Sequence, residues 1–179
     1  MTMLHRHWFA PVLCLAAMLA QAEDSAVTSN PSIDMAGYLR VSLQAADHRA
    51  QRRISEAEFM RLAADPETLV LDARSKEKFD QLHVKGAINL SFPDITVDSL
   101  ERTIPDKNRR ILIYCNNNFA NAPEAFPTKM PSAALNISTY IALYNYGYRN
   151  VYELAPRIDI KSSRLEFEGT GRRTQQVER

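Results

Sequence analysis

The sequence predicts an α/β fold with a central parallel sheet that is flanked by helices on both faces. Two short apolar runs, residues 68–72 and 110–114, have the length and composition of strands that are buried on both sides. Segments with helical periodicity alternate with such runs along the chain, which is typical of parallel strands joined by helices. The 179 residues are 45% hydrophobic and 24% charged, so one packed domain is expected.

The charge balance argues against two classes of partner. The chain has 22 basic and 21 acidic residues and a formal net charge of +1. It therefore lacks the basic excess that proteins use to bind nucleic acids or anionic membrane surfaces, and we expect neither partner. No pair of His, Cys or Asp residues has the sequence spacing of metal ligands, so no metal or other cofactor is expected.

Residues 1–22 have the pattern of a secretory signal peptide. Arg6 precedes an apolar run over residues 9–20, and the sequence Ala-Gln-Ala that ends at Ala22 resembles a cleavage site. The apolar run is too short for a membrane span, which needs about 20 residues. We therefore expect a periplasmic or secreted protein with no stable membrane anchor after cleavage. A buried N-terminal helix or an uncleaved anchor is the alternative.

Export changes the meaning of the cysteines. The sequence has two, Cys14 and Cys115, and cleavage after Ala22 would remove the first. The mature chain would then hold one thiol and no internal disulfide. A lone cysteine in an oxidising compartment is either buried and inert or retained for its reactivity, and composition does not distinguish the two.

Residues 23–52 are predicted to form a polar segment followed by a helix over residues 34–50. Apolar residues recur in this helix at spacings of three and four, so they are expected to form one stripe. The helix is expected to pack on the outside of the main domain. The residues of the predicted stripe are Tyr38, Leu39, Leu43, Ala46 and Ala50.

The main domain is predicted over residues 53–168. Ser55 followed by Glu58 forms a capping box, so a helix is expected to begin there. Gly147 is expected to end the longest helix, over residues 132–146, at its C-cap. The remaining predicted elements are strands at 68–72, 110–114 and 150–154, a short helix at 75–81, a turn at 83–87, an apolar stretch at 88–90 and a helical turn or two at 96–102. Residues 169–179 are polar and charged, and a disordered tail is expected.

Asp72 ends one of the two strongest strand predictions, and Cys115 directly follows the other. The carboxyl ends of parallel strands meet at one edge of the sheet, where ligands gather in folds of this class. We therefore expect these two side chains to be neighbours in space, although they are distant in sequence.

Several segments resemble the rhodanese-like family in their order and spacing. Asp72-Ala73-Arg74 is similar to the Asp-x-Arg of the family, and residues 83–89 are similar to its His-x-x-Gly-Ala-x-Asn element. Residues 111–115 resemble the strand that delivers the active cysteine into a loop. Residues 143–151 resemble the helix, the Gly-Tyr turn and the final strand. The resemblance covers about residues 53–154.

The resemblance implies a sulfurtransferase in which Cys115 attacks a sulfane sulfur, holds it as a persulfide and passes it to an acceptor. The nucleophile is the thiolate, so the pKa of this thiol must fall below the usual value of about 8.5. Inward-facing backbone N–H groups that lead into a helix N-terminus stabilise such a charge. The loop expected to supply them consists of Asn116, Asn117, Asn118, Phe119 and Ala120.

This loop departs from the pattern of the family loops that handle sulfur. It contains no Gly, Lys, Arg, Ser or Thr, so a backbone nest depends on its Asn residues, which tolerate positive φ better than most. An anionic donor such as thiosulfate lacks a cation here, and Lys129 is the candidate to fold back and supply one. Lys129 belongs to an insertion, residues 122–131, that is interpreted as a lid, a docking surface for a protein acceptor or a stiff loop.

One further residue argues against phosphatase activity, and three others have predicted structural roles. Phosphatases of the same fold use Cys-x5-Arg, and Asn121 stands at the Arg position, so phosphatase activity is not expected. Asp72 and Arg74 are predicted to form a structural ion pair that holds the site loop, rather than to act in catalysis. His83 is predicted to order its turn by hydrogen bonding.

The leading hypothesis is sulfur transfer in the periplasm, from a small sulfur donor to a thiol acceptor or a periplasmic protein. A competing hypothesis is a catalytically silent rhodanese-like module that uses the same pocket to recognise a small molecule or a partner protein. A third is a redox thiol that forms mixed disulfides with its partners. The loop without Gly favours the binding module, and the retained cysteine favours the other two.

Overall fold

The computed structural model describes residues 30–171. These residues fall into two units that divide between Ile33 and Asp34. In the first unit, the N–H groups of Ser32 and Ile33 donate to Oδ1 and to the carbonyl of Asn30, which closes a short turn. The predicted signal peptide and Cys14 lie outside the described residues, and so do residues 172–179 of the predicted tail.

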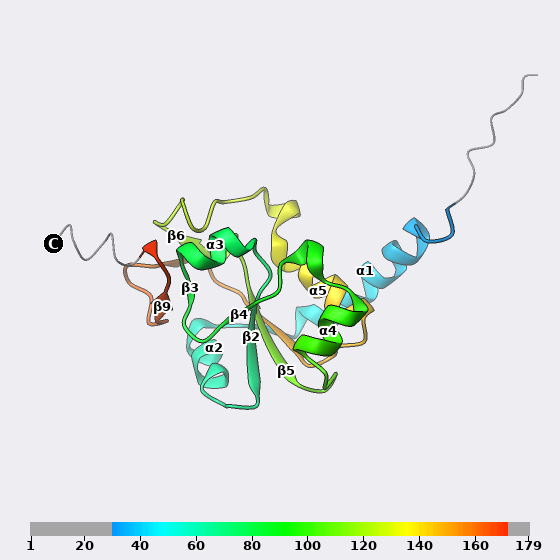
Figure 1. The fold of residues 1–179 in the computed structure, drawn as a ribbon, viewed down its shortest axis with the longest axis horizontal. Coiled ribbons are helices and arrows are strands. Elements are labelled where there is room, and N and C mark those ends of the chain that lie inside the picture. Colours follow the sequence, from blue (N-terminus) through cyan, green and yellow to red (C-terminus); the bar gives the residue numbers. More distant parts are fainter. Residues whose placement is uncertain (1–29, 172–179) are drawn as a thin grey trace, which may run out of the picture. The chain divides into compact units, whose positions relative to one another are not determined.

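Five parallel strands form the central sheet of the second unit, so the predicted fold class is confirmed (Figure 1). In spatial order they are β1 (Arg53–Ile54), β7 (Val151–Leu154), β5 (Arg110–Tyr114), β2 (Thr68–Asp72) and β4 (Ile88–Asn89). The two longest described strands, β2 and β5, lie side by side, with Asp72 opposite Tyr114. Both are buried on both faces, which explains why each is a continuous apolar run in the sequence.

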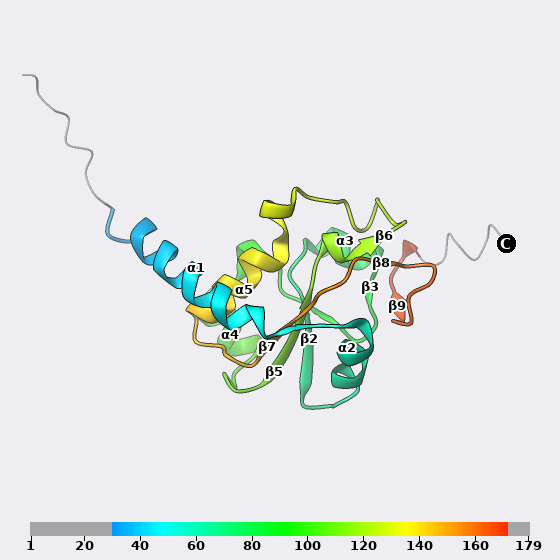
Figure 2. The same cartoon turned by 180° about the vertical axis from the view of Figure 1, so that it is seen from behind.

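Helices cover both faces of the sheet, as predicted (Figures 1 and 2). One face carries α1 (Met35–Ala50), α4 (Val97–Thr103) and α5 (Leu135–Asn145), and the other carries α2 (Glu56–Ala63) and α3 (Lys76–Gln81). Side chains alternate between the faces along each strand. Ile113 of β5 therefore packs with Leu143 of α5, and its neighbour Leu112 packs in the other cluster with Phe59 of α2.

Smaller elements complete the described fold. They are the antiparallel pair of β3 (His83–Val84) and β9 (Phe167–Glu168), the parallel pair of β6 (Phe119–Ala120) and β8 (Ile158–Asp159), and the 3-10 turns η1 (Phe92–Asp94), η2 (Asn116–Asn118) and η3 (Pro131–Ala133). Beyond β9, the N–H of Thr170 donates to the carbonyl of Asp80. Contacts with the domain therefore continue past residue 168, where the main domain was predicted to end.

Helix ends follow the signals in the sequence. Oγ of Ser55 accepts the N–H of Glu58 and caps α2, although the Glu58 carboxylate binds Arg61 and does not close the capping box. Gly147, directly after the last turn of α5, has a φ of 95°, a left-handed conformation that favours glycine. The start of α5 differs from the prediction: residues 131–133 form η3, extended Ala134 interrupts the helix, and α5 begins at residue 135.

The residues of the predicted α1 stripe are all exposed to solvent, and the helix does pack on the outside of the domain, as expected. Leu39 and Leu43 are 56% and 72% exposed. The helix packs on α5 through a different side, where Ala45 is buried and His48 Nδ1 lies 2.8 Å from the hydroxyl of Tyr140. A small residue allows the two helices to approach closely, and the polar pair requires that approach for its hydrogen bond.

Candidate functional site

Cys115 lies directly after β5, at the carboxyl edge of the sheet. Asp72 ends β2 at the same edge, and it is opposite Tyr114 in the register of the two strands. The structure therefore places both residues at the same edge of the sheet, and contact between their side chains stays a prediction. Both side chains are inside the protein, since Asp72 is 0% and Cys115 is 1% exposed.

The cysteine loop, residues 115–118, folds as the single 3-10 turn η2. Within residues 30–171, Asn121 is the one residue other than glycine with a positive φ. The three asparagines of the loop therefore do not adopt the positive φ that the sequence suggested for a backbone nest. A side chain closes the loop instead. Oδ1 of Asn118 accepts the N–H of Cys115 at 2.8 Å, and its Nδ2 donates to the carbonyl of Leu154 at 2.7 Å. This asparagine thereby ties the cysteine loop to the end of β7.

Backbone N–H groups surround the sulfur of Cys115. Those of Asn136, Asn117 and Asn118 favour the charged form of the thiol, and we call these three groups the amide cradle. Burial raises the pKa of the Cys115 thiol, the amide cradle opposes this rise, and the negative charge of Glu153 adds to it. The expected lowering of this pKa is therefore wrong for the resting protein, because desolvation of the thiolate outweighs the hydrogen bonds to it.

Alkylation of Cys115 by iodoacetamide is expected to follow the raised pKa. In the folded protein, the midpoint of the rise in rate with pH should lie above the midpoint for the same thiol in denaturant, whose pKa is about 8.5. Because the folded state holds this proton more tightly, the thiol stabilises the fold below the pKa of the unfolded chain. That contribution is lost as the pH rises through the folded pKa.

The measurement is the rate against pH for the wild type, with the rate of Cys115→Ser subtracted so that any other thiol is removed. Urea denaturation of both proteins over the same pH range follows the stability. The wild type should lose more stability than Cys115→Ser as the pH rises. A midpoint in the folded protein at or below that of the denatured chain would contradict the burial effect.

The predicted ion pair of Asp72 and Arg74 is present, and both side chains are buried. Nη2 of Arg74 lies 2.5 Å from Oδ2 of Asp72, and Nε lies 2.9 Å from Oδ1. The remaining donors reach the carbonyls of Ala125 and Leu82, each at 2.7 Å. The ring of Phe126 lies 4.1 Å from the guanidinium carbon. The pair thereby connects the end of β2 to the corner after α3 and to the insertion.

His83 lies on β3, and its contacts order the turn between α3 and β3. Nδ1 lies 2.7 Å from the carbonyl oxygen of Phe79, whose ring stacks on the imidazole at a centroid distance of 3.7 Å. Nε2 lies 3.3 Å from the carboxylate of Glu168 on β9. These contacts match the predicted structural role, and none of them involves the cysteine loop.

The insertion folds back onto the cysteine loop. The side chain of Asn117 and the backbone of Lys129 exchange two hydrogen bonds of 2.9 Å. Lys129 also lines a pocket of about 320 Å³ together with Asn116 and with Lys78 of α3. The structure therefore brings Lys129 to the loop and adds a second cation that the sequence did not single out. Binding of a sulfur donor by either lysine stays a prediction.

Phe119 and Ala120 belong to β6 rather than to the turn that follows Cys115. Their strand pairs with β8, and the ring of Phe119 packs against Tyr114, Phe126 and Phe167. A buried aromatic side chain in such a cluster is part of the core. The cysteine loop is therefore shorter than predicted, and Phe119 belongs to the core next to it.

Asn136 is the site residue that the sequence did not reveal. Its backbone N–H belongs to the amide cradle, and its Nδ2 donates to Oδ1 of Asn118 at 3.0 Å. It lies in the first turn of α5, where the positive end of the helix dipole favours a negative charge. The general preference of anions for helix N-termini pointed to this region. This preference did not identify the residue, because the first residue of the helix cannot be read from the sequence after the proline-rich insertion.

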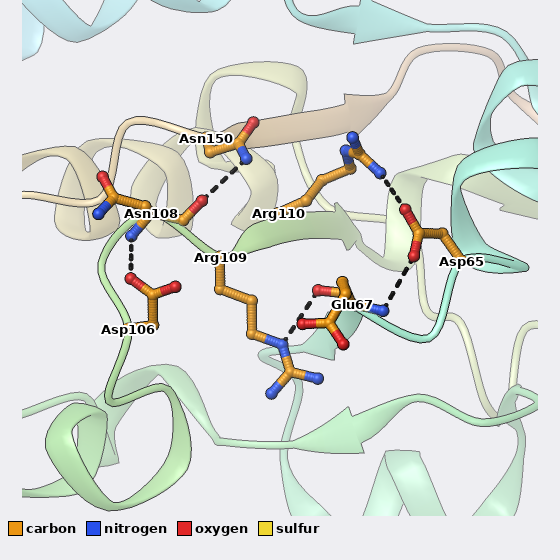
Figure 3. A pocket seen from close by; sticks show the side chains of 7 residues that line it. All are labelled: Asp65, Glu67, Asp106, Asn108, Arg109, Arg110 and Asn150. Atoms are coloured by element: carbon orange, nitrogen blue, oxygen red, sulfur yellow. Dashed lines mark hydrogen bonds and ion pairs between the residues drawn. The ribbon is translucent and has the colours of Figure 1, made fainter.

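Another hollow, of about 480 Å³, lies at the opposite edge of the sheet, where β2 and β5 begin (Figure 3). Both of its arginines have partners within the hollow: Arg110 donates to the carboxylate of Asp65, and Arg109 donates to the backbone carbonyl of Glu67 (Figure 3). These contacts order the loops that lead into the two strands. The residues that line it include no Cys, Ser or His, so we assign the candidate site to the edge that holds Cys115.

Cys115 is a free thiol. Within residues 30–171, no three His, Cys, Asp or Glu side chains come close enough together to hold a metal ion. Over the same range, no helix has the length and apolar character that crossing a membrane requires.

Comparison with known proteins adds a family to this geometry. The family model described as "Rhodanese-like domain" matches residues 55–155, more than half of the chain. Thiosulfate sulfurtransferase PspE of Escherichia coli (strain K12) is 37% identical over 46 residues, which are 26% of this chain and 43% of PspE. The match thus spans less than half of the length of that relative.

Several solved structures are similar at low identity. The rhodanese-like domain of the Alr3790 protein from Anabaena sp is 21% identical, with 68% of this chain and 81% of that chain covered and a TM-score of 0.49. The BH2092 protein from Bacillus halodurans is 21% identical, with 74% and 88% covered and a TM-score of 0.49. A rhodanese from E. coli, solved with anions, is 24% identical, with 57% and 98% covered and a TM-score of 0.39.

Proposed function

The chain belongs to the rhodanese-like domain family, and we propose that it is a sulfurtransferase that carries sulfur as a persulfide on Cys115. The observation that supports this most directly is the position of Cys115 directly after β5, where the three backbone N–H groups of the amide cradle favour its charged form. A cysteine that only packs in a core makes weak hydrogen bonds at most. Three donors to one sulfur instead suit an anionic sulfur that forms during a reaction.

The proposed reaction consists of two displacements at sulfur. Burial keeps the Cys115 thiol protonated in the resting protein, so the first step is the loss of this proton to solvent. The thiolate then attacks the terminal sulfur of the donor: the bond from Sγ to that sulfur forms, and the bond from that sulfur to the rest of the donor breaks. The leaving group departs with the electron pair, as sulfite when the donor is thiosulfate. An acceptor thiolate finally attacks the outer sulfur, and Cys115 leaves as a thiolate.

Two lysines favour an anionic donor. Lys78 and Lys129 line the pocket that Asn116 of the cysteine loop also lines, and the loop has no cation of its own. Thiosulfate, which the name of the relative PspE includes, is a donor of this kind. We therefore propose thiosulfate or a persulfide as the donor, and a small thiol or a periplasmic protein as the acceptor.

The periplasmic location is part of this proposal. It rests on the signal-peptide pattern of residues 1–22. Fractionation of cells that express the full chain tests it, since a chain cleaved after Ala22 should be recovered with the periplasmic contents. Recovery of the uncleaved chain in the cytoplasm would contradict the location and would leave the proposed chemistry of Cys115 unaffected.

A second candidate function is a binding module that recognises a small molecule or a partner protein at the same pocket without catalysis. The 1% exposure of Cys115 and the raised pKa of its thiol favour it. A donor must reach this sulfur, and the thiol must lose its proton before it attacks. The two functions differ in one observable, which is covalently bound sulfur on Cys115.

The test is intact mass spectrometry after incubation with thiosulfate and, separately, with an organic persulfide. We expect the wild type to gain one sulfur atom and Cys115→Ser to gain none. Subsequent addition of a small thiol should return the wild type to its original mass. Slower loading from thiosulfate in Lys78→Met and in Lys129→Met than in the wild type would support the role of Lys78 and Lys129. A folded wild type that gains no sulfur from either donor would sink the sulfurtransferase and leave the binding module.

A further inference from the structure

The exposed apolar residues of α1 form a surface that the proposed function does not use. They recur at spacings of three and four, so they share one side of the helix. We call this surface the α1 face; its residues are Met35, Leu39, Leu43, Ala46 and Ala50, all of them exposed. Leu43 is two positions from Ala45, hence about 200° around the helix axis. The α1 face therefore points away from the side that packs on α5.

We infer that the α1 face binds the same face of a second copy of this chain, as an antiparallel pair of helices related by a two-fold axis. A two-fold interface buries the same residues of both copies. The large residues Leu39 and Leu43 precede the small residues Ala46 and Ala50 along the helix. Antiparallel pairing places Leu39 opposite Ala50 and Leu43 opposite Ala46 of the second copy. Large side chains then meet small ones in every layer, which lets them interdigitate.

Charge complementarity supports the same register. Arg40 and Asp47 are seven residues apart, so they lie about 20° from each other, on one flank of the α1 face. A two-fold axis perpendicular to the helices brings this flank of both copies together. With Leu43 opposite Ala46, Arg40 of each copy faces Asp47 of the other, which gives two ion pairs by symmetry. A shift by one heptad would instead place the two Arg40 side chains opposite each other, where like charges repel.

Both charged groups are available for such contacts. Within residues 30–171, Asp47 has no hydrogen bond or ion pair through its side chain. Arg40 lies 3.8 Å from the carboxylate of Asp34, and both of those side chains are exposed to solvent. An exposed pair at this distance contributes little to stability, so it yields readily to a closer partner.

The test is the oligomeric state of the full chain, measured by analytical ultracentrifugation over a concentration series. We expect a reversible dimer of the wild type. Leu43→Glu is expected to raise its dissociation constant at least about tenfold, because it places charges at the centre of an apolar contact. Val97→Glu is the matched control, since Val97 is an exposed apolar residue of α4, and it should leave the dissociation constant unchanged.

Charge variants then test the register. Arg40→Asp and Asp47→Arg should each raise the dissociation constant about tenfold, and the double variant should restore the wild-type value, because the pairs re-form with exchanged signs. A wild type that stays monomeric at every concentration overturns the proposal. A dimer that none of these variants weakens also overturns the proposal, and association through the apolar run of residues 9–20 would produce that result. A double variant as weak as the single ones overturns the antiparallel register.

Discussion

Replacing Arg74 with Met is expected to lower the free energy of unfolding by about 3–5 kcal/mol. The substitution leaves the carboxylate of Asp72 buried without its counter-charge, and it removes the donors to the carbonyls of Leu82 and Ala125. Each buried polar group without a partner carries its own desolvation cost. Met retains only the inner, apolar part of the side chain, so the loss also includes the contact of the guanidinium carbon with the ring of Phe126 and the volume of that group.

Urea denaturation measures this loss, and two further variants isolate its cause. Arg61→Met breaks the exposed pair with Glu58 and is expected to destabilise the protein far less than Arg74→Met does, because solvent screens the exposed pair. The double variant Asp72→Asn/Arg74→Met should be more stable than Arg74→Met, because it leaves no uncompensated charge in the core. Equal losses for Arg74→Met and Arg61→Met would contradict the assignment of Arg74 as the residue that holds the insertion to the sheet.

Replacing Asn118 with Ala is expected to cost about 2–4 kcal/mol and to disrupt the candidate site at the same time. Four hydrogen bonds of one side chain are lost, and the groups that lose this partner are the N–H of Cys115, Nδ2 of Asn136 and the carbonyls of Leu154 and Pro156. Because these bonds tie the cysteine loop to α5 and to the end of β7, their loss permits local opening of the loop. Alkylation of Cys115 should therefore become faster at a fixed pH, while loading with sulfur should fall.

The matched control is Asn117→Ala, on the same 3-10 turn. The side chain of Asn117 is more exposed, and its two hydrogen bonds go to the backbone of Lys129 in the insertion. We expect a cost of less than about 1 kcal/mol and little change in the alkylation rate. Urea denaturation and iodoacetamide kinetics of the two variants decide the matter. Indistinguishable results for Asn117→Ala and Asn118→Ala would refute the central role of Asn118.

Arg74 and Asn118 together explain how a loop without glycine forms a site at this edge. Arg74 binds the carbonyl of Ala125 near the start of the insertion, and Asn117 binds the backbone near its end. Asn118 fixes the turn that carries Cys115. Polar side chains thus hold in place a loop that contains no glycine, and the sulfur of Cys115 is buried within it.

Much of the fold could be predicted because its signals act locally. A strand buried on both faces needs an apolar residue at nearly every position, so β2 and β5 are visible in the sequence. Ser55 caps α2 and Gly147 ends α5 through backbone groups within one turn. The ion pair of Asp72 and Arg74 joins residues only two positions apart, so the motif already implied the contact.

The packing of α1 could not be predicted, because both sides of this helix carry apolar residues. Leu39 and Leu43 give the stronger pattern, yet the helix buries Ala45 against α5. The choice depends on the surface of α5, where the hydroxyl of Tyr140 binds His48. Periodicity describes one helix at a time and contains no information about the shape and polarity of its partner.

The sequence by itself determined the fold class, the order of the elements and the position of Cys115 at the carboxyl edge of the sheet. Tertiary structure alone decided the chemistry of that cysteine. Backbone N–H groups of the cysteine loop and of Asn136 favour the charged form of the thiol, and the negative charge of Glu153 on β7 disfavours it. These groups come from segments far apart in the chain, and the pKa of the thiol is set by their combined burial and charge. Desolvation and Coulomb interactions depend on distances in space, which the spacing of residues in a sequence does not contain.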